Sequence, residues 1–305
     1  MDRRDFITAG AVAVAAALSI SKKPALAQEQ NAPENGKFKL RYAPSFGQFE
    51  KHAGKDLIDQ IKFMADEGFS AMFDNGLMGK SSQQQEAIAK ELDRHGMIMG
   101  PFVLYADFSA ESMVTGKKED RDMLIERTKQ GVEVCKRANA KWALMVPGRY
   151  NQQTAWEYQT ANVVDNLKAC AEVCEELGMI IVIEPLNKRD HPGLFLTKIP
   201  QAYQVCKAVN HPNCKIVNDI YHQQITEGNL IPNIDMAWSE IASFHVGDNP
   251  GRKEPGTGEI NYKNIFKHIY NKGYKGVLCT EHGRSKPGKE GERAMIDAYR
   301  ACDDF

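Results

Sequence analysis

The amino-acid sequence predicts an α/β protein folded as a single (β/α)8 TIM barrel. Short apolar runs rich in β-forming residues alternate with longer amphipathic stretches at intervals of roughly 30 residues. Eight such pairs fit in the chain, which matches the usual size of an eight-fold βα barrel. A doubly wound open sheet is the alternative. However, no glycine-rich phosphate-binding motif follows the first expected strand, where Tyr42–Gly47 stand instead.

The expected strands and helices follow one another without a gap. We expect the strands to begin near Phe38, Ala71, Ile98, Trp142, Ile180, Lys215, Ile241 and Gly276. The amphipathic stretches predict helices over residues 55–67, 83–95, 120–137, 155–177, 200–209, 262–271 and 290–302. Four glycines stand just after these helices, where a left-handed residue often ends a helix: Gly68, Gly96, Gly178 and Gly273. Because no linker interrupts the pattern, we expect residues 38–305 to form one catalytic domain.

The first 27 residues have the features of an export signal. Arg3 and Arg4 precede an alanine-rich apolar stretch over residues 9–20, and a small-x-small cleavage motif ends at Ala27. This arrangement resembles a twin-arginine signal, which implies passage through the twin-arginine export machinery to the periplasm. The apolar stretch is short for a membrane span, so we expect no stable membrane insertion after cleavage, and an uncleaved anchor is the alternative. The polar residues 28–37 predict a disordered lead-in.

The composition excludes several classes of protein. Of the 305 residues, 42% are hydrophobic and 26% are charged, which is typical of a globular protein and not of a disordered, collagen-like or multi-span membrane chain. The chain has 39 basic and 40 acidic residues, so no basic excess is available for phosphates, and we expect no nucleic-acid partner. Seven scattered cysteines are an odd number, which favours free core thiols over a disulfide framework.

Four consecutive strands in the second half each end in a polar side chain. These are Glu184, Asp219, His245 and Glu281, separated by 35, 26 and 36 residues. Because the carboxyl ends of barrel strands meet at the active site, we expect these four side chains to converge. Three carboxylates and an imidazole would repel one another or be costly to bury unless a cation lies between them. Oxygen and nitrogen donors of this kind suit Mg²⁺ or Mn²⁺.

Each of these residues taken singly also has a structural explanation. Glu184 could cap the following helix, and Asp219 could be the N-cap of the segment that starts at Tyr221. His245 could be an ordinary core histidine. Coincidence at four successive strand ends is much rarer than any one of these, so the sequence favours a metal site.

Three motifs in the same half resemble the hydroxypyruvate isomerase family, which belongs to the xylose isomerase-like barrels. They are Glu184-Pro185-Leu186-Asn187, Asp219-Ile220-Tyr221-His222 and the long run from Asp248 to Tyr262. The resemblance covers about residues 178–281. It implies that Glu184 and Glu281 are the catalytic pair, and that Glu184, Asp219, His245 and Glu281 are metal ligands. Hydroxypyruvate isomerases often have glutamine where this chain has His245, whereas sugar epimerases of the superfamily have histidine, so the substrate stays open.

The implied reaction interconverts hydroxypyruvate and 2-hydroxy-3-oxopropanoate (tartronate semialdehyde) through an enediol. Such a proton transfer needs an acid, a base and a positive charge beside the oxygens. His222 lies three residues past Asp219, so we expect it to reach a substrate oxygen. Arg252 could bind a substrate carboxylate with its planar fork, or it could instead pair with Glu254 or Asp248.

Two other functions fit the same residues. One is a ketose 3-epimerase or sugar-acid isomerase, with the same chemistry on a longer substrate. The other is a non-catalytic periplasmic carbohydrate-binding protein, which has no need of two opposed glutamates. In each case the expected partner is a small hydroxy-keto acid or sugar. An apurinic endonuclease would need further histidine ligands and a basic face, which the sequence lacks. The sequence leaves open whether the protein forms a homo-oligomer.

We expect the mature protein to be exported in its folded form and to begin near Gln28, because the cleavage motif ends at Ala27. N-terminal sequencing of the protein from the cell envelope tests this expectation. A cytoplasmic chain that still begins at Met1 would contradict it.

Overall fold

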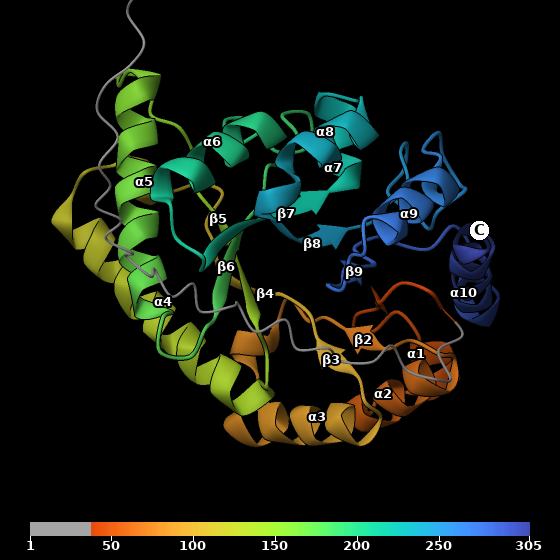
Figure 1. Ribbon diagram of the computed structural model, residues 1–305. Helices are drawn as coiled ribbons and strands as arrows, with labels where there is room; N and C mark the ends of the chain where they lie inside the picture. The colour runs from red at the N-terminus through yellow and green to blue at the C-terminus, as the bar shows by residue number, and fades with distance from the viewer. Residues whose placement is uncertain (1–37) are drawn as a thin grey trace, which may run out of the picture. The chain divides into compact units, whose positions relative to one another are not determined.

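The computed structural model describes residues 38–305, which form a barrel of parallel strands with helices around it (Figure 1). The expected export signal (residues 1–27) and lead-in (residues 28–37) lie outside the described residues, so both stay predictions. Within residues 38–305, no helix combines the length and the apolar composition needed to cross a lipid bilayer.

Strand segments in parallel register build the wall of the barrel. They are β1 (Tyr42–Ala43), β2 (Ala71–Met72), β3 (Ile98–Met99), β4 (Phe102–Ala106), β5 (Trp142–Val146), β6 (Ile180–Ile183), β7 (Cys214–Asp219), β8 (Ile241–His245) and β9 (Leu278–Cys279). One sheet has the order β1-β9-β8-β7-β6-β5-β4, and a second pairs β2 with β3. A parallel bridge between Ser45 and Phe73 joins the ends of β1 and β2, which completes the ring.

Helices lie outside the strands, as expected for a βα barrel (Figure 1). They are α1 (Glu50–Ala53), α2 (Leu57–Asp66), α3 (Ser82–Arg94), α4 (Lys118–Ala138), α5 (Trp156–Val173), α6 (Ile199–Val209), α7 (Ile220–Thr226), α8 (Leu230–Ala237), α9 (Tyr262–Asn271) and α10 (Gly288–Asp303). The four glycines expected after helices all have positive φ, at 87° for Gly68, 62° for Gly96, 74° for Gly178 and 72° for Gly273.

The structure differs from the sequence prediction at several places. The helix expected over residues 155–177 ends at Val173, and the last strand begins at Leu278 and not near Gly276. The first strand begins at Tyr42 and not near Phe38. The third strand is divided into β3 and β4, because Gly100 and Pro101 interrupt it and proline has no N–H to donate to a neighbouring strand. The short helices α1, α7 and α8 are not predicted, because they span too few residues to show a clear helical period.

The core has two layers because successive strand residues point to opposite sides of the wall. In β5, Leu144 and Val146 belong to the small inner cluster, whereas Ala143 and Met145 belong to the large outer cluster beneath the helices. Valine and leucine make up seven of the twelve buried residues of the inner cluster, so the barrel is filled with apolar side chains. The functional site therefore has to lie at an end of the barrel.

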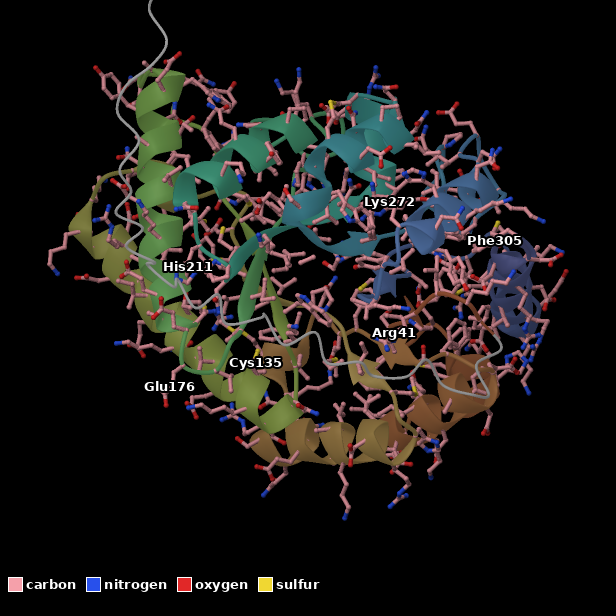
Figure 2. The ribbon with its side chains drawn as sticks, in the orientation of Figure 1. Arg41, Cys135, Glu176, His211, Lys272 and Phe305 are labelled. Atoms are coloured by element: carbon pink, nitrogen blue, oxygen red, sulfur yellow. The ribbon has the colours of Figure 1, made fainter. Side chains whose placement is uncertain are left out.

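The cysteines are free thiols, as the sequence predicts, and six of the seven are buried. Burial raises the pKa of Cys135 to about 12, so this thiol stays protonated and unreactive. Long side chains project outward from the ring of helices, among them the exposed Glu176 (Figure 2).

One buried carboxylate ties the end of the chain to its beginning. Glu292 on α10 is fully buried, and it accepts hydrogen bonds from the backbone N–H groups of Lys51 (2.7 Å) and His52 (2.9 Å) in α1. It also accepts one from Arg284 Nη1 at 2.9 Å. If the carboxylate were removed, the N–H of Lys51 would lose this partner, while His52 N–H would keep Phe49 O at 3.2 Å and Arg284 Nη1 would keep Gln48 O at 2.6 Å.

We expect Glu292→Ala to lower the free energy of unfolding by at least ~1–3 kcal/mol, the usual cost of leaving one buried partner unsatisfied. Urea denaturation measures the change. Glu290→Ala on the same helix is the matched control, because Glu290 is exposed and pairs only with Lys286. Equal losses in the two variants would contradict the assignment.

Candidate active site at the carboxyl end of the barrel

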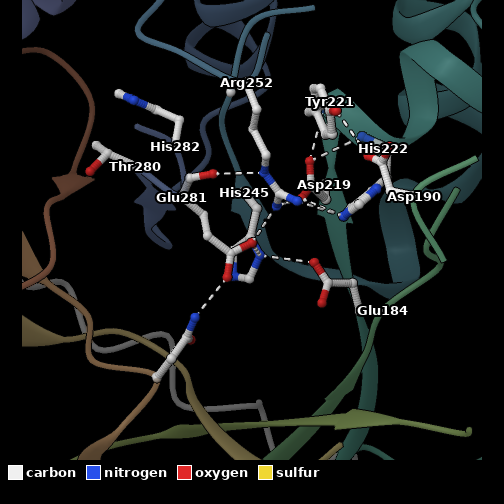
Figure 3. Close-up of polar contacts among 12 residues, drawn as sticks. Glu184, Asp190, Asp219, Tyr221, His222, His245, Arg252, Thr280, Glu281 and His282 are labelled. Carbon is white, nitrogen blue, oxygen red and sulfur yellow. Dashed lines mark hydrogen bonds and ion pairs between the residues drawn. The ribbon is translucent and has the colours of Figure 1, made fainter. Parts of the chain in front are cut away.

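The four predicted side chains converge at one end of the barrel (Figure 3). Glu184 directly follows β6, Asp219 and His245 are the last residues of β7 and β8, and Glu281 lies just past β9. Each offers one metal-ligand atom, and these four atoms all lie within 4.8 Å of one another. Glu184, Asp219 and His245 are buried, and Glu281 is partly exposed at the mouth. We refer to these four residues as the carboxylate cluster.

His245 lies between the two glutamates of the cluster. Its Nδ1 is 3.0 Å from Glu184 Oε1 and 3.0 Å from Glu281 Oε2. The ring is fully buried, and burial alone would lower its pKa. However, the charges of Glu281 and Glu184 together raise the pKa of His245 well above the ordinary value. His245 is thus part of the site and not only a core residue.

Asp219 makes contacts in two directions: the structure confirms it as the N-cap of α7, and its role as a metal ligand stays a prediction. Its Oδ1 accepts from the N–H groups of Tyr221 (2.8 Å) and His222 (3.2 Å), which makes it the N-cap of α7. Its Oδ2 faces the cluster and accepts from Arg252 Nη2 at 2.8 Å. The cap fixes the orientation of the carboxylate, because one oxygen is held by the helix while the other points to the site.

Arg252 pairs with the cluster and not with its neighbours in the sequence. Its Nη2 donates to Asp219 Oδ2 and, at 2.7 Å, to Glu281 Oε2 (Figure 3). The alternative of a salt bridge with Glu254 or Asp248 is wrong. Glu254 accepts from the backbone N–H of Ser285, and Asp248 accepts backbone N–H groups of its own loop.

His222 is held as a neutral imidazole with the proton on Nε2. Its Nδ1 faces the side-chain Nδ2 of Asn187 at 2.6 Å and the backbone N–H of Asn187 at 3.3 Å. Asn187 Oδ1 accepts from the N–H groups of Arg189 and Asp190, so its Nδ2 end must face the ring as a donor. Burial lowers the pKa of His222 to about 4. The Nε2 atom faces the cluster, where it lies 3.0 Å from Arg252 Nη1 and 3.5 Å from Asp219 Oδ2.

Two asparagines of the site were not identified from the sequence. Asn75 follows β2 and donates from Nδ2 to Glu281 Oε1 at 2.7 Å. Asn187 belongs to the Glu-Pro-Leu-Asn motif, so the motif itself carried a signal for it. Asn75 had only its position after a strand as a signal, because asparagine there is more often part of a turn.

The two glutamates have opposite pKa shifts. Burial raises the pKa of Glu184 above the ordinary carboxyl value, and the charge of Glu281 adds to this while His245 partly offsets it. Burial acts in the same direction on Glu281, but His245 and Arg252 together hold its pKa well below the ordinary value. Two carboxyl groups whose pKa values are pushed apart are suited to act as an acid and a base.

A cavity of about 420 Å³ opens above the cluster. One side is polar and includes Glu184, Glu281, His222 and Arg252. The other side is apolar, and its side chains are Val103, Ala106, Phe108, Leu144, Val146 and Leu186. Phe108 stands at the rim, where its ring centroid lies 5.1 Å from that of His191.

The cluster has the donor set that a divalent cation needs. Three carboxylates and one imidazole place their ligand atoms within 4.8 Å of one another, and hard or borderline divalent cations prefer oxygen and nitrogen donors. The residues therefore fit the predicted metal. Glu184, Asp219, His245 and Glu281 are the side chains that could hold it.

Several known proteins resemble this chain in sequence or in fold. The family model for xylose isomerase-like TIM barrels matches residues 61–302. Hydroxypyruvate isomerase from Escherichia coli (strain K12) is 39% identical over 140 residues, which cover 46% of this chain and 54% of that protein. 2-Oxo-tetronate isomerase from Cupriavidus necator is 34% identical over 139 residues, which cover 46% of this chain and 53% of that protein. The chain thus matches these curated relatives over about half of their length.

A solved structure extends the likeness to nearly the whole barrel. D-psicose 3-epimerase from Clostridium cellulolyticum H10, solved with D-tagatose, has a TM-score of 0.69 and 18% identity, and the match covers 87% of this chain and 98% of that one. At this identity the likeness concerns the fold alone. The predicted fold class is confirmed.

In the metal-free protein we expect His222 to stay neutral where an exposed histidine titrates, near pH ~6.5, because its folded pKa is about 4. Since this pKa lies below the unfolded value, the stabilising contribution of the neutral ring is present above pH ~6.5 and is lost as the pH falls toward the folded pKa. Nitrogen NMR of the imidazole measures both the titration and the tautomer.

Asn187→Asp is the contrasting variant, because it replaces the N–H donor beside Nδ1 with a carboxylate. We expect it to raise the pKa of His222 and to bring a proton to Nδ1. An ordinary pKa for His222 in the unmodified protein would contradict the described hydrogen bonds.

Proposed function

The chain belongs to the xylose isomerase-like TIM barrel family, and from this premise we propose that it is an isomerase of a small hydroxy-keto compound. The proposed reaction is the interconversion of hydroxypyruvate and 2-hydroxy-3-oxopropanoate. The names of the relatives support this choice, because they are isomerases of hydroxypyruvate and of 2-oxo-tetronate.

One observation carries the proposal: two glutamates with opposite pKa shifts lie within reach of one small substrate. Glu184 Oε1 and Glu281 Oε2 are each 3.0 Å from the same atom, His245 Nδ1. A proton transfer between adjacent carbons needs one group that takes a proton and another that gives one. A binding protein has no need of this pair, so the arrangement favours catalysis.

The residues divide the work as follows. Glu281, whose pKa is lowered, takes a proton from one carbon, and Glu184 delivers a proton at the neighbouring carbon. The hydroxyl proton on the first carbon passes to the oxygen on the second, so one hydrogen moves between the carbons and one between the oxygens. His222 donates its Nε2–H to a substrate oxygen. Asn75 holds Glu281 in place through the hydrogen bond to Oε1. A divalent cation bound by the cluster would stabilise negative charge on the substrate oxygens.

A second candidate function is a sugar-acid isomerase or a ketose 3-epimerase, and in the epimerase the proton leaves one face of a carbon and is replaced on the other face of the same carbon. The size of the cavity favours this candidate. A volume of about 420 Å³ lies in the range of pockets that hold drug-sized ligands, and a three-carbon acid would fill only part of it. The apolar side chains opposite the cluster have no counterpart in a substrate as small and polar as hydroxypyruvate. Assays of the metal-loaded protein with hydroxypyruvate and with common ketoses distinguish the two candidates.

We expect Asp219→Asn to weaken binding of Mg²⁺ or Mn²⁺ by at least the ~10–100-fold that is typical of disturbed metal surroundings. Asparagine keeps an oxygen for the cap of α7 but removes one negative charge from the cluster. Metal analysis after dialysis measures the effect. Asp56→Asn is the control, because Asp56 caps α2 by the same two hydrogen bonds and is not part of the cluster. Equal metal content in all three proteins would refute the site.

We expect Glu281→Gln and Glu184→Gln to slow isomerisation by about 10²–10⁴-fold or more, because each removes a proton-transfer group. Loss of metal and loss of a base look alike in the rate, so metal content is measured in parallel. Deuterium exchange from solvent into the substrate then reports proton transfer directly.

Glu259→Gln is the control for these variants, since Glu259 is an exposed carboxylate that contacts Gln224 and Asn249 and not the cluster. We expect this variant to exchange deuterium at the unmodified rate. If Glu281→Gln kept its metal and exchanged deuterium as fast as this control, the two-glutamate mechanism would be wrong.

A further inference from the structure

The guanidinium of Arg252 lies among the side chains that are proposed to hold a metal. Its Nη2 is 2.8 Å from Asp219 Oδ2 and 2.7 Å from Glu281 Oε2, so one nitrogen bridges two members of the cluster. In Figure 3 the side chain reaches between these two carboxylates from the loop that follows β8. A carboxylate oxygen that accepts from a guanidinium has one lone pair fewer to offer to a metal ion, and the guanidinium charge repels the cation.

Arg252 is also the main source of fixed positive charge for this cluster. Within residues 38–305, it is the one arginine or lysine whose side chain pairs with Glu184, Asp219 or Glu281. Without it, His245 would be left with three carboxylates in a buried pocket, which is an unfavourable arrangement. The guanidinium thus supplies part of the charge that a divalent cation would supply.

The loop holds the backbone of Arg252 in a fixed position. Asp248 accepts from four backbone N–H groups of this loop at 2.8 to 3.1 Å: those of Asn249, Gly256, Gly258 and Ile260. The carbonyl oxygen of Arg252 accepts from Gly283 N–H at 3.0 Å. Arg252 itself has a positive φ of 49°, which a residue other than glycine rarely adopts. If the guanidinium moves, the side chain must rotate while the loop stays in place.

One contact of the guanidinium is unfavourable. Its Nη1 lies 3.0 Å from His222 Nε2, and this nitrogen carries a proton because Nδ1 is an acceptor. Two N–H donors therefore face each other. The two carboxylates hold the guanidinium there, together with the carbonyl oxygen of Glu281, which accepts from Arg252 Nε at 3.0 Å, and the ring of Tyr221, whose centroid is 4.8 Å from Cζ. Once a cation binds the carboxylates, the repulsion between the N–H groups of Arg252 and His222 favours release of the Arg252 side chain.

We propose that Arg252 is the built-in counter-cation of the metal-free cluster, and that a divalent cation displaces its guanidinium from Asp219 and Glu281. Arg252 lines the cavity. The displaced guanidinium therefore faces the cavity, where it can bind the acid group of a substrate. Metal therefore binds first and prepares the site for an anionic substrate. This inference rests on the metal site of the proposed function.

The test is the affinity for Mn²⁺ alone, measured by competition with a coloured chelator in the unmodified protein and in Arg252→Met. If the guanidinium competes with the metal, its removal should tighten Mn²⁺ binding, within the ~5–150-fold that is usual for coupled sites. Arg252→Gln is measured as well, because it removes the charge but keeps N–H donors for Asp219 and Glu281. We expect Arg252→Gln to bind Mn²⁺ more tightly as well, so this variant tests the proposal even if Arg252→Met fails to fold.

The matched control is Arg284→Met. The side chain of Arg284 is 25% exposed, close to the 27% of Arg252, and it also pairs with a buried glutamate, Glu292, which is not part of the cluster. We expect this variant to bind Mn²⁺ with unchanged affinity. Thermal melting with and without Mn²⁺ is a second readout, and the metal should raise the melting temperature most in the Arg252 variants.

The outcomes separate this inference from the metal site itself. Tighter Mn²⁺ binding in the Arg252 variants and not in Arg284→Met supports the displacement. Equal or weaker binding in the Arg252 variants overturns it, while the metal site stands if the unmodified protein binds Mn²⁺. If none of the proteins binds Mn²⁺, the metal site and this inference are both wrong.

Discussion

The site is governed by one electrostatic constraint: three carboxylates share a largely buried pocket, and positive charge has to lie among them. An ionised carboxylate without a partner costs several kcal/mol in such surroundings. The chain meets the constraint with His245 between the two glutamates and with Arg252 between Asp219 and Glu281. Both cationic groups come from β8 and the loop after it. The opposite pKa shifts of Glu184 and Glu281 follow from this placement, because His245 and Arg252 together outweigh the effect of burial on Glu281, whereas burial outweighs His245 at Glu184.

The convergence of the cluster was predictable from the sequence, because it depends on a rule of the fold. Parallel strands of a barrel end at the same edge, so residues that follow successive strands must meet there. Glu184, Asp219 and His245 end or follow strands with clear apolar patterns, and the spacing matched one βα unit each time. The helix positions were predictable for a similar reason, since amphipathic stretches of ten or more residues show their period.

The partners of the cluster were not predictable, because they depend on loop geometry that has no period. Glu254 and Asp248 lie closer to Arg252 in the sequence than Asp219 or Glu281 does. Asp248 is instead occupied by the backbone N–H groups of the loop, and Glu254 by Ser285. Both acids shape the loop, and Arg252 is directed to the cluster as a result. Asn75 shows the same limit, since only the folded chain brings the end of β2 next to Glu281. The break at Gly100 and Pro101 could have been anticipated from the proline alone.

Different residues of the cavity lining determine the type of reaction and the size of the substrate. The charged side is fixed by strand ends, a helix cap and a loop with many hydrogen bonds, so a change there disturbs proton transfer. The apolar side comes from β4, β5 and the loop after β6, and none of its side chains contacts the carboxylates through a hydrogen bond or ion pair in the described chain. Phe108 stands on a loop and is 47% exposed, so it can be exchanged for a smaller or larger residue at little cost to the fold. Substrate length can therefore change on the apolar side while the acid and base stay in place, so one barrel can serve isomerases and epimerases that both begin by removing a proton next to a carbonyl.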